Sequence, residues 1–253
     1  MTMTKNNSLL RPLWQRMFGQ AWVLNLVLFV LLGAWRAYGI LGPETESVRQ
    51  LILLGFLLMW FLPFIFFSKS GRQTMGFKKV ERPIWLLWGP LLGATASLVA
   101  FAVGFLLYGR NENNWFITIS EQYLIGDLIS QLPMPVLIAM FTIPAMTFSP
   151  IGEEFFFRGM IHESVRAHWS ERVAILVNAL AFGGVHLLHY GITRDASGWH
   201  FLLVPGSLWM LLMMGTSWLF TLCRRRSGSI WPAVVAHSVF NLVMNLTIFL
   251  ILL

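Results

Sequence analysis

The sequence is poor in charge and nearly without cysteine. Asp, Glu, Lys and Arg make up only 11% of the 253 residues, less than half of the roughly 25% found in soluble globular domains. This shortage excludes a disordered chain, a coiled coil and an ordinary water-soluble enzyme. The single cysteine, Cys223, excludes a disulfide scaffold and a cysteine-rich metal site. Because 57% of the residues are hydrophobic, the composition predicts an integral membrane protein.

The charges that are present are mainly positive. The 18 Lys and Arg residues against 11 Asp and Glu residues give a formal net charge of +7. Basic residues collect in the cytoplasmic loops of membrane proteins and set their orientation, so we interpret the excess as a topology signal and expect no nucleic-acid partner. The basic N-terminus and the basic segments 69–82, 158–172 and 224–229 are therefore predicted to lie in the cytoplasm. No cleavable signal peptide is evident, and we expect the first span to be retained.

Apolar segments recur along the whole chain at roughly 20 residues, the length that a helix needs to cross the hydrocarbon core of a bilayer. We expect an all-α fold, a polytopic membrane helix bundle of about seven to eight transmembrane helices in a single membrane domain over residues 1–253. An eighth helix, interfacial or re-entrant, can lie in the segment 109–131, which is acidic on balance. The seven predicted spans are 18–41, 48–68, 83–108, 133–157, 172–189, 201–223 and 230–251.

Ionisable side chains inside apolar stretches are the most informative residues, because they are costly in lipid and by default face a cavity or the bundle interior. They gather after residue 150, with Glu153 and Glu154 in TFSPIGEEFFFRGM, His186 in NALAFGGVHLLHY, and His237 and Asn241 in WPAVVAHSVFNLVMN. The remaining polar residues of this kind are interpreted as interfacial, snorkelling or topology-setting side chains; they are Asn25, Arg36, Arg49, His162, His168, His189, His200, Arg224, Arg225 and Arg226.

The spacing of these residues predicts which of them share a helix face. Glu154 and Arg158 are four residues apart and can pair, and the same spacing relates His237 to Asn241 and Phe182 to His186. A tight turn near Ser170 would leave Glu153 and His186 about 25 Å from it on either side, at about 1.5 Å per residue. An antiparallel helix pair therefore brings the two to the same level. For His237 to join them, the hairpin 158–172 must project as a solvated segment on the cytoplasmic side, and the site is expected to open to the cytosol.

Three motifs, Glu153-Glu154-x-x-x-Arg158, Phe182-x-x-x-His186 and His237-x-x-x-Asn241, follow one another in this order. Together they resemble the motifs of the CPBP family of intramembrane metalloproteases, which comprises the CAAX proteases and bacteriocin-processing enzymes and is also called the Abi family. The resemblance covers roughly residues 130–245 and implies that this segment is the catalytic core, preceded by N-terminal helices within 18–125.

The resemblance also implies roles for single residues. Glu153 matches the general base that acts on a water molecule, and His186 matches the histidine that holds and polarises that water. His237 and Asn241 match the pair that stabilises the oxyanion. Glu154 and Arg158 match residues that support the site, as does Phe182 of the second motif.

Zinc is an alternative way to activate the water. Glu153, His186 and His237 form the set of two histidines and one carboxylate that catalytic zinc accepts, with a position left for water. Glu154 would then have to act as the base, because Glu153 would be a ligand. The sequence contains no HExxH motif, and we favour direct activation by Glu153.

Two further function classes stay open. A non-catalytic membrane scaffold or a bacteriocin self-immunity protein can use the same fold to bind a partner. A proton-coupled transporter or a haem protein can use intramembrane Glu and His, although no inverted repeat is evident. The expected substrate is a peptide or a membrane-tethered protein, and the expected location is a bacterial cell membrane.

Overall fold

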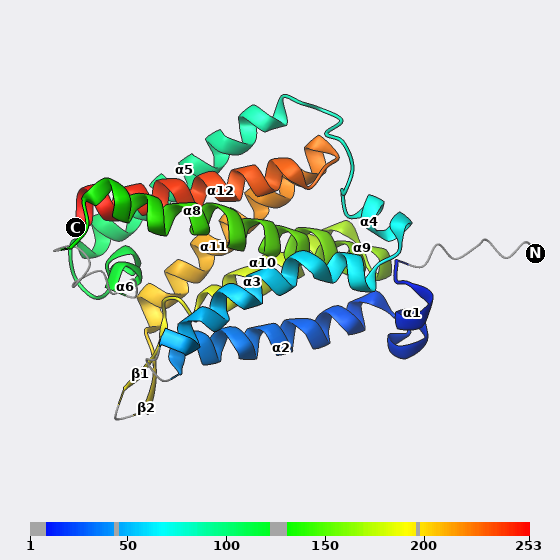
Figure 1. The fold of residues 1–253 in the computed structure, drawn as a ribbon, viewed down its shortest axis with the longest axis horizontal. Helices are drawn as coiled ribbons and strands as arrows, with labels where there is room; N and C mark the ends of the chain where they lie inside the picture. Colours follow the sequence, from blue (N-terminus) through cyan, green and yellow to red (C-terminus); the bar gives the residue numbers. More distant parts are fainter. Residues whose placement is uncertain (1–8, 43–45, 122–130, 196–197) are drawn as a thin grey trace, which may run out of the picture.

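The protein is described by a computed structural model that covers residues 9–42, 46–121, 131–195 and 198–253. Long helices run side by side along the longest axis, and they confirm the predicted all-α membrane bundle (Figure 1). The helices are α1 (Pro12–Phe18), α2 (Ala21–Leu41), α3 (Glu46–Phe66), α4 (Lys69–Thr74), α5 (Trp85–Tyr108), α6 (Trp115–Glu121), α8 (Met134–Glu153), the π-helical segment η1 (Glu154–Ile161), α9 (His162–His168), α10 (Glu171–His186), α11 (Leu203–Ser227), α12 (Trp231–Thr247) and the π-helical segment η2 (Ile248–Leu252). The strands β1 (Ile192–Asp195) and β2 (Gly198–Phe201) form an antiparallel hairpin.

Each of the seven predicted spans corresponds to a helix of the bundle. Within the described residues, five helices are long and apolar enough to cross a membrane by length and composition: Ala21–Leu41, Trp85–Tyr108, Met134–His168, Leu203–Ser227 and Trp231–Leu252. The other two are shorter, since the apolar part of α3 is Ile52–Phe66 and α10 has 16 residues. The segment predicted to hold an interfacial helix contains α6, and the part of it at 122–130 lies outside the described residues.

The helices α5 and α12 make the most extensive contact between described elements, and small residues allow it. A Cβ atom added to Gly93 would overlap the backbone carbonyl oxygen of Ala236, and one added to Gly89 would lie 2.7 Å from that of Pro232. Glycine therefore lets the two backbones touch, as is common between membrane helices. Because Ala236 directly precedes His237, this contact also sets the position of the histidine.

A continuous rod, formed by α8, η1 and α9, runs from Met134 to His168 and turns back into α10 at Ser170. The Ser170 hydroxyl accepts the amide hydrogen of Val173 and caps the N-terminus of α10. The predicted turn near Ser170 is thus confirmed. Within the rod, the wider π-helical winding begins at Glu154, and such segments are frequent at functional sites.

The prediction of a solvated hairpin over 158–172 is wrong for its first half. Residues 158–165 are buried, including His162, and the exposed residues are 166–170 and Arg172. The reason is that the C-terminal end of α11 lies against α9 well before Ser170, where Arg224 forms a 2.6 Å ion pair with Glu163. Arg224 also donates to the backbone carbonyl of Thr74 at 2.6 Å. It is a buried structural side chain in addition to any effect on topology.

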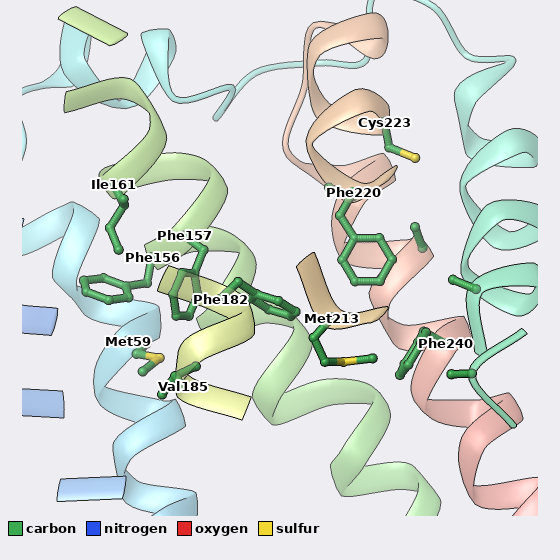
Figure 2. Close-up of a cluster of buried hydrophobic side chains, with 14 of the residues drawn as sticks. Met59, Phe156, Phe157, Ile161, Phe182, Val185, Met213, Phe220, Cys223 and Phe240 are labelled. Carbon is green, nitrogen blue, oxygen red and sulfur yellow. The ribbon is translucent and has the colours of Figure 1, made fainter. Parts of the chain in front are cut away.

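A cluster of buried apolar side chains joins these helices at mid-depth (Figure 2). It brings Phe156 and Phe157 of η1 against Phe182 of α10, and Phe220 of α11 lies beside them. Phe157 and Phe182 meet edge to face, with ring centroids 5.3 Å apart. Phe182 and Phe220 of this cluster also line the cavity described next.

Candidate active site

The predicted catalytic side chains come from three separate helices and line one cavity. Glu153 is the last residue of α8, His186 is the last residue of α10, and His237 and Asn241 lie on α12. All four, together with Phe182, line a cavity of about 670 Å³. The expectation that these residues meet agrees with their shared cavity, and their catalytic roles stay predictions.

Glu153 is 1% exposed and has a partner that the sequence analysis missed. Nη1 of Arg36, on α2, donates to Glu153 Oε1 at 2.7 Å, and Arg36 is itself only 5% exposed. The other carboxylate oxygen, Oε2, lies 3.9 Å from His237 Nε2. The interpretation of Arg36 as a snorkelling residue is wrong, because tertiary packing turns its guanidinium into the bundle. The rule that intramembrane charges face the interior would have found it.

His189 also belongs to this cluster, contrary to its interpretation as an interfacial residue. Its Nε2 atom lies 2.9 Å from Nη2 of Arg36. A guanidinium carries only donors, so His189 Nε2 accepts this hydrogen bond. The side chain lines the same cavity as Glu153.

A second carboxylate, Glu154, lies behind the first and holds His237. His237 Nδ1 donates to Glu154 Oε1 at 2.8 Å, and Arg158 Nη1 lies 3.1 Å from the same oxygen. This confirms the predicted pairing of Glu154 with Arg158. The Arg158 guanidinium sits over the Phe182 ring at 4.1 Å, and the Phe220 ring stacks on His237 at 4.9 Å. The orientation of the imidazole is therefore set by a hydrogen bond to one ring nitrogen and by an aromatic ring on its face.

His186 is held in one tautomer by its own helix. Its Nδ1 lies 2.7 Å from the carbonyl oxygen of Phe182. Because a carbonyl only accepts, Nδ1 carries the hydrogen, and Nε2 of the neutral ring is left with a lone pair. The Phe182 ring packs against the imidazole with centroids 4.3 Å apart, so this residue supports His186 one helical turn earlier, as predicted.

Asn241 is arranged differently from the expectation. Its Nδ2 donates to the Ala145 carbonyl oxygen at 2.7 Å and to the Ser149 hydroxyl at 3.2 Å. Both amide hydrogens are thus engaged with α8. In this arrangement the side chain fastens α12 to α8 one turn after His237.

The residues that line the cavity reach the end of the bundle that lies opposite the N-terminus, and the predicted opening to the cytosol stays a prediction. Beyond the catalytic candidates the cavity is lined by Gly42 at the end of α2, by Ile52, by Thr118 and by Met244. In Figure 1 these elements end opposite the N-terminus, near α6 and the β1–β2 hairpin.

The expected zinc ligands do not form a ready metal site. Among the residues that the structure describes, no group of three or more His, Cys, Asp or Glu side chains is placed to hold a metal ion. The positive guanidinium of Arg36 already occupies Glu153 Oε1 and opposes a second cation there. The donor set as arranged does not fit zinc, and the zinc site stays a prediction.

The motif residues fall inside a segment that matches a known family. Residues 135–243 match the family described as type II CAAX prenyl endopeptidase Rce1-like. This match supports membership of the CAAX-protease family. The family consists of membrane-embedded proteases that act on protein or peptide substrates, and the helix bundle agrees with membrane embedding. Comparison with curated proteins and with solved structures finds no match.

Proposed function

We propose that this CAAX-family protein is an intramembrane endopeptidase in which Glu153 and His186 activate a water molecule. The observation that carries the proposal is the convergence of Glu153, His186 and His237, from three helices, on one buried cavity. The cavity of about 670 Å³ is within the range of roughly 300–1,000 Å³ typical of small-molecule sites. It has room for a short stretch of extended peptide.

In the proposed reaction the water lies between Glu153 Oε2 and the lone pair on His186 Nε2. The water oxygen attacks the scissile carbonyl carbon while one of its protons passes to Glu153 Oε2. When the C–N bond breaks, that proton passes from Glu153 to the leaving nitrogen. A positioned general base of this kind contributes about 10²–10⁴-fold to the rate.

The oxyanion of the tetrahedral intermediate is assigned to His237. With Nδ1–H donated to Glu154, a protonated His237 directs Nε2–H toward the cavity and the developing charge. One such donor is worth about 2.7–4 kcal/mol in a site that excludes water. Asn241 adds a second donor only if one of its amide hydrogens leaves α8, so we propose that its first role is to hold α12 in place.

The proposal is tested by comparing membranes that contain wild-type protein with membranes that contain the Glu153→Gln or His186→Ala variant, using mass spectrometry of released peptides. Both variants should lose the cleavage products. Thr216→Ala is the matched control, because Thr216 lines the same cavity but donates its hydroxyl to the Leu212 carbonyl of its own helix. Unchanged products in both variants, at equal protein levels, would refute the proposal.

One observation favours the non-catalytic alternative. The Glu153 oxygen Oε1 and both Asn241 amide hydrogens are already engaged in contacts within the protein, as they would be in a scaffold or a self-immunity protein. That alternative predicts that Glu153→Gln retains full biological function. We also propose that the protein lies in a bacterial cell membrane, with its N-terminus in the cytoplasm.

A further inference from the structure

We infer that Arg36 is a positioning residue for Glu153, so that the N-terminal half of the chain completes the site. The inference rests on the proposed role of Glu153 as the base. Arg36 lies on α2, far outside the segment 135–243 that matches the protease family. Its side chain nevertheless lines the cavity together with the motif residues.

The geometry of the contact leaves one oxygen of the base available. Arg36 binds Glu153 through Nη1 and Oε1 alone, at 2.7 Å. Rotation about the last side-chain bond of Glu153 is thereby restricted, and Oε2 is left on the side of His237 Nε2. A bidentate pair would engage both oxygens and hinder proton transfer. The single contact instead orients the carboxylate and leaves Oε2 to receive the proton.

The guanidinium is held from the other side by His189. Nη2 of Arg36 donates to His189 Nε2 at 2.9 Å, and the Phe56 ring lies 5.4 Å from Arg36 Cζ. Arg36 thus has one nitrogen on the base, one on a histidine, and an aromatic ring beside its plane. A long side chain with these restraints has little rotational freedom, which is the condition for orienting another group.

Charge balance gives Arg36 a second effect on the base. An ionised carboxylate that is removed from water is costly unless a charge and hydrogen bonds compensate for it. Glu153 is 1% exposed, and among described residues Arg36 is the only Lys or Arg that lines the cavity. The neighbouring cation Arg158 is paired with Glu154 instead. Arg36 therefore supplies the positive charge that allows Glu153 to remain a carboxylate.

The experiment measures kcat and KM for Arg36→Ala and Arg36→Lys, with a peptide that spans a cleavage site found by the membrane comparison above. We expect Arg36→Ala to lower kcat roughly 100-fold, the loss that misplacement of a reacting group by about 1 Å produces, with little change in KM. Arg36→Lys should retain part of the activity. Added guanidinium chloride at millimolar concentration should partly restore Arg36→Ala, because the ion can enter the space that the side chain leaves in the cavity.

The matched control is Asn25→Ala. Asn25 is buried on the same helix, three turns before Arg36, and its amide donates to the Met160 carbonyl and the Ser164 hydroxyl, at 2.8 Å each, away from the cavity. This variant should lose stability without a lower kcat and without rescue by guanidinium. If Arg36→Ala does not fold, His189→Gln and His189→Leu replace it, since the Gln oxygen can still accept from Arg36 and Leu cannot. We then expect kcat to fall in the Leu variant and to be largely kept in the Gln variant.

The outcomes separate this inference from the proposed function. A wild-type kcat in Arg36→Ala, or in His189→Leu where that variant is used, overturns the inference. If Glu153→Gln is inactive at the same time, the proposed function is left intact. A rise in KM alone in Arg36→Ala also overturns the inference, because it would make Arg36 a substrate-binding residue. Full activity in Glu153→Gln overturns the proposed function itself.

Discussion

The close contact between α5 and α12 predicts a large effect from a single added methyl group. In Gly93→Ala the new Cβ would overlap the Ala236 carbonyl oxygen and would lie 2.8 Å from the carbonyl carbon and 3.2 Å from Cα of the same residue. All three atoms are backbone, so no side chain can rotate away. The helices must move apart, and His237, the next residue on α12, must move with them.

The magnitude follows from that separation. A gap of about 0.5–1 Å forfeits a quarter to a half of the van der Waals attraction between facing atoms, and overpacking of this kind costs about 1–3 kcal/mol. For a chain of this size each kcal/mol lowers the unfolding midpoint by about 2–4 °C. We therefore expect Gly93→Ala to unfold roughly 2–12 °C below the wild type, and to cleave more slowly because the distance from His237 to Glu154 changes.

Thermal unfolding of the purified protein in detergent, followed by tryptophan fluorescence, measures this effect. The control is Gly215→Ala on α11, where a Cβ would meet no atom within 4 Å. Alanine is the better helix former by about 1 kcal/mol, so the control should be neutral or more stable. Equal midpoints for Gly93→Ala and Gly215→Ala would refute the close approach of α5 and α12.

Two other predictions concern the basic end and the metal. Arg224→Gln removes one of the two arginines that pair with buried Glu163, and Arg166 stays paired with it at 2.7 Å. Loss of the charged contact should cost about 1.5–3 kcal/mol in unfolding free energy, whereas Arg226→Gln, at an exposed position, should cost little. Similar losses in both variants would contradict the buried ion pair. Incubation with a zinc chelator should leave the cleavage rate unchanged if Glu153 activates the water directly; loss of activity that added Zn²⁺ restores would support the zinc alternative instead.

Much of the candidate site could be predicted from the sequence because it depends on local spacing. Residues four apart share a helix face whatever the tertiary structure, so the pairing of Glu154 with Arg158 and of Phe182 with His186 follows from helical geometry alone. Equal chain lengths on either side of Ser170 likewise predict that Glu153 and His186 meet.

Arg36 and His189 could not be assigned in the same way. An arginine five residues before the end of an apolar helix is long enough either to reach the interface or to turn inward. The choice depends on whether a buried carboxylate of another helix lies opposite, and here Glu153 of α8 does. The same holds for His162, which is buried where the C-terminal end of α11 lies against α9 through the ion pair of Arg224 with Glu163.

Composition and helical periodicity by themselves determined that this chain is a membrane helix bundle, and the order of three short motifs indicated the protease family that residues 135–243 match. The direction of the cavity, the partner of Glu153 and the engagement of the Asn241 amide were decided only by tertiary structure. The physical reason is that the cost of burying a charge or a donor depends on what faces it. The group that faces a buried charge comes from another helix, and packing decides where that helix lies in the bundle. The glycine contact between α5 and α12, for example, sets the position of His237.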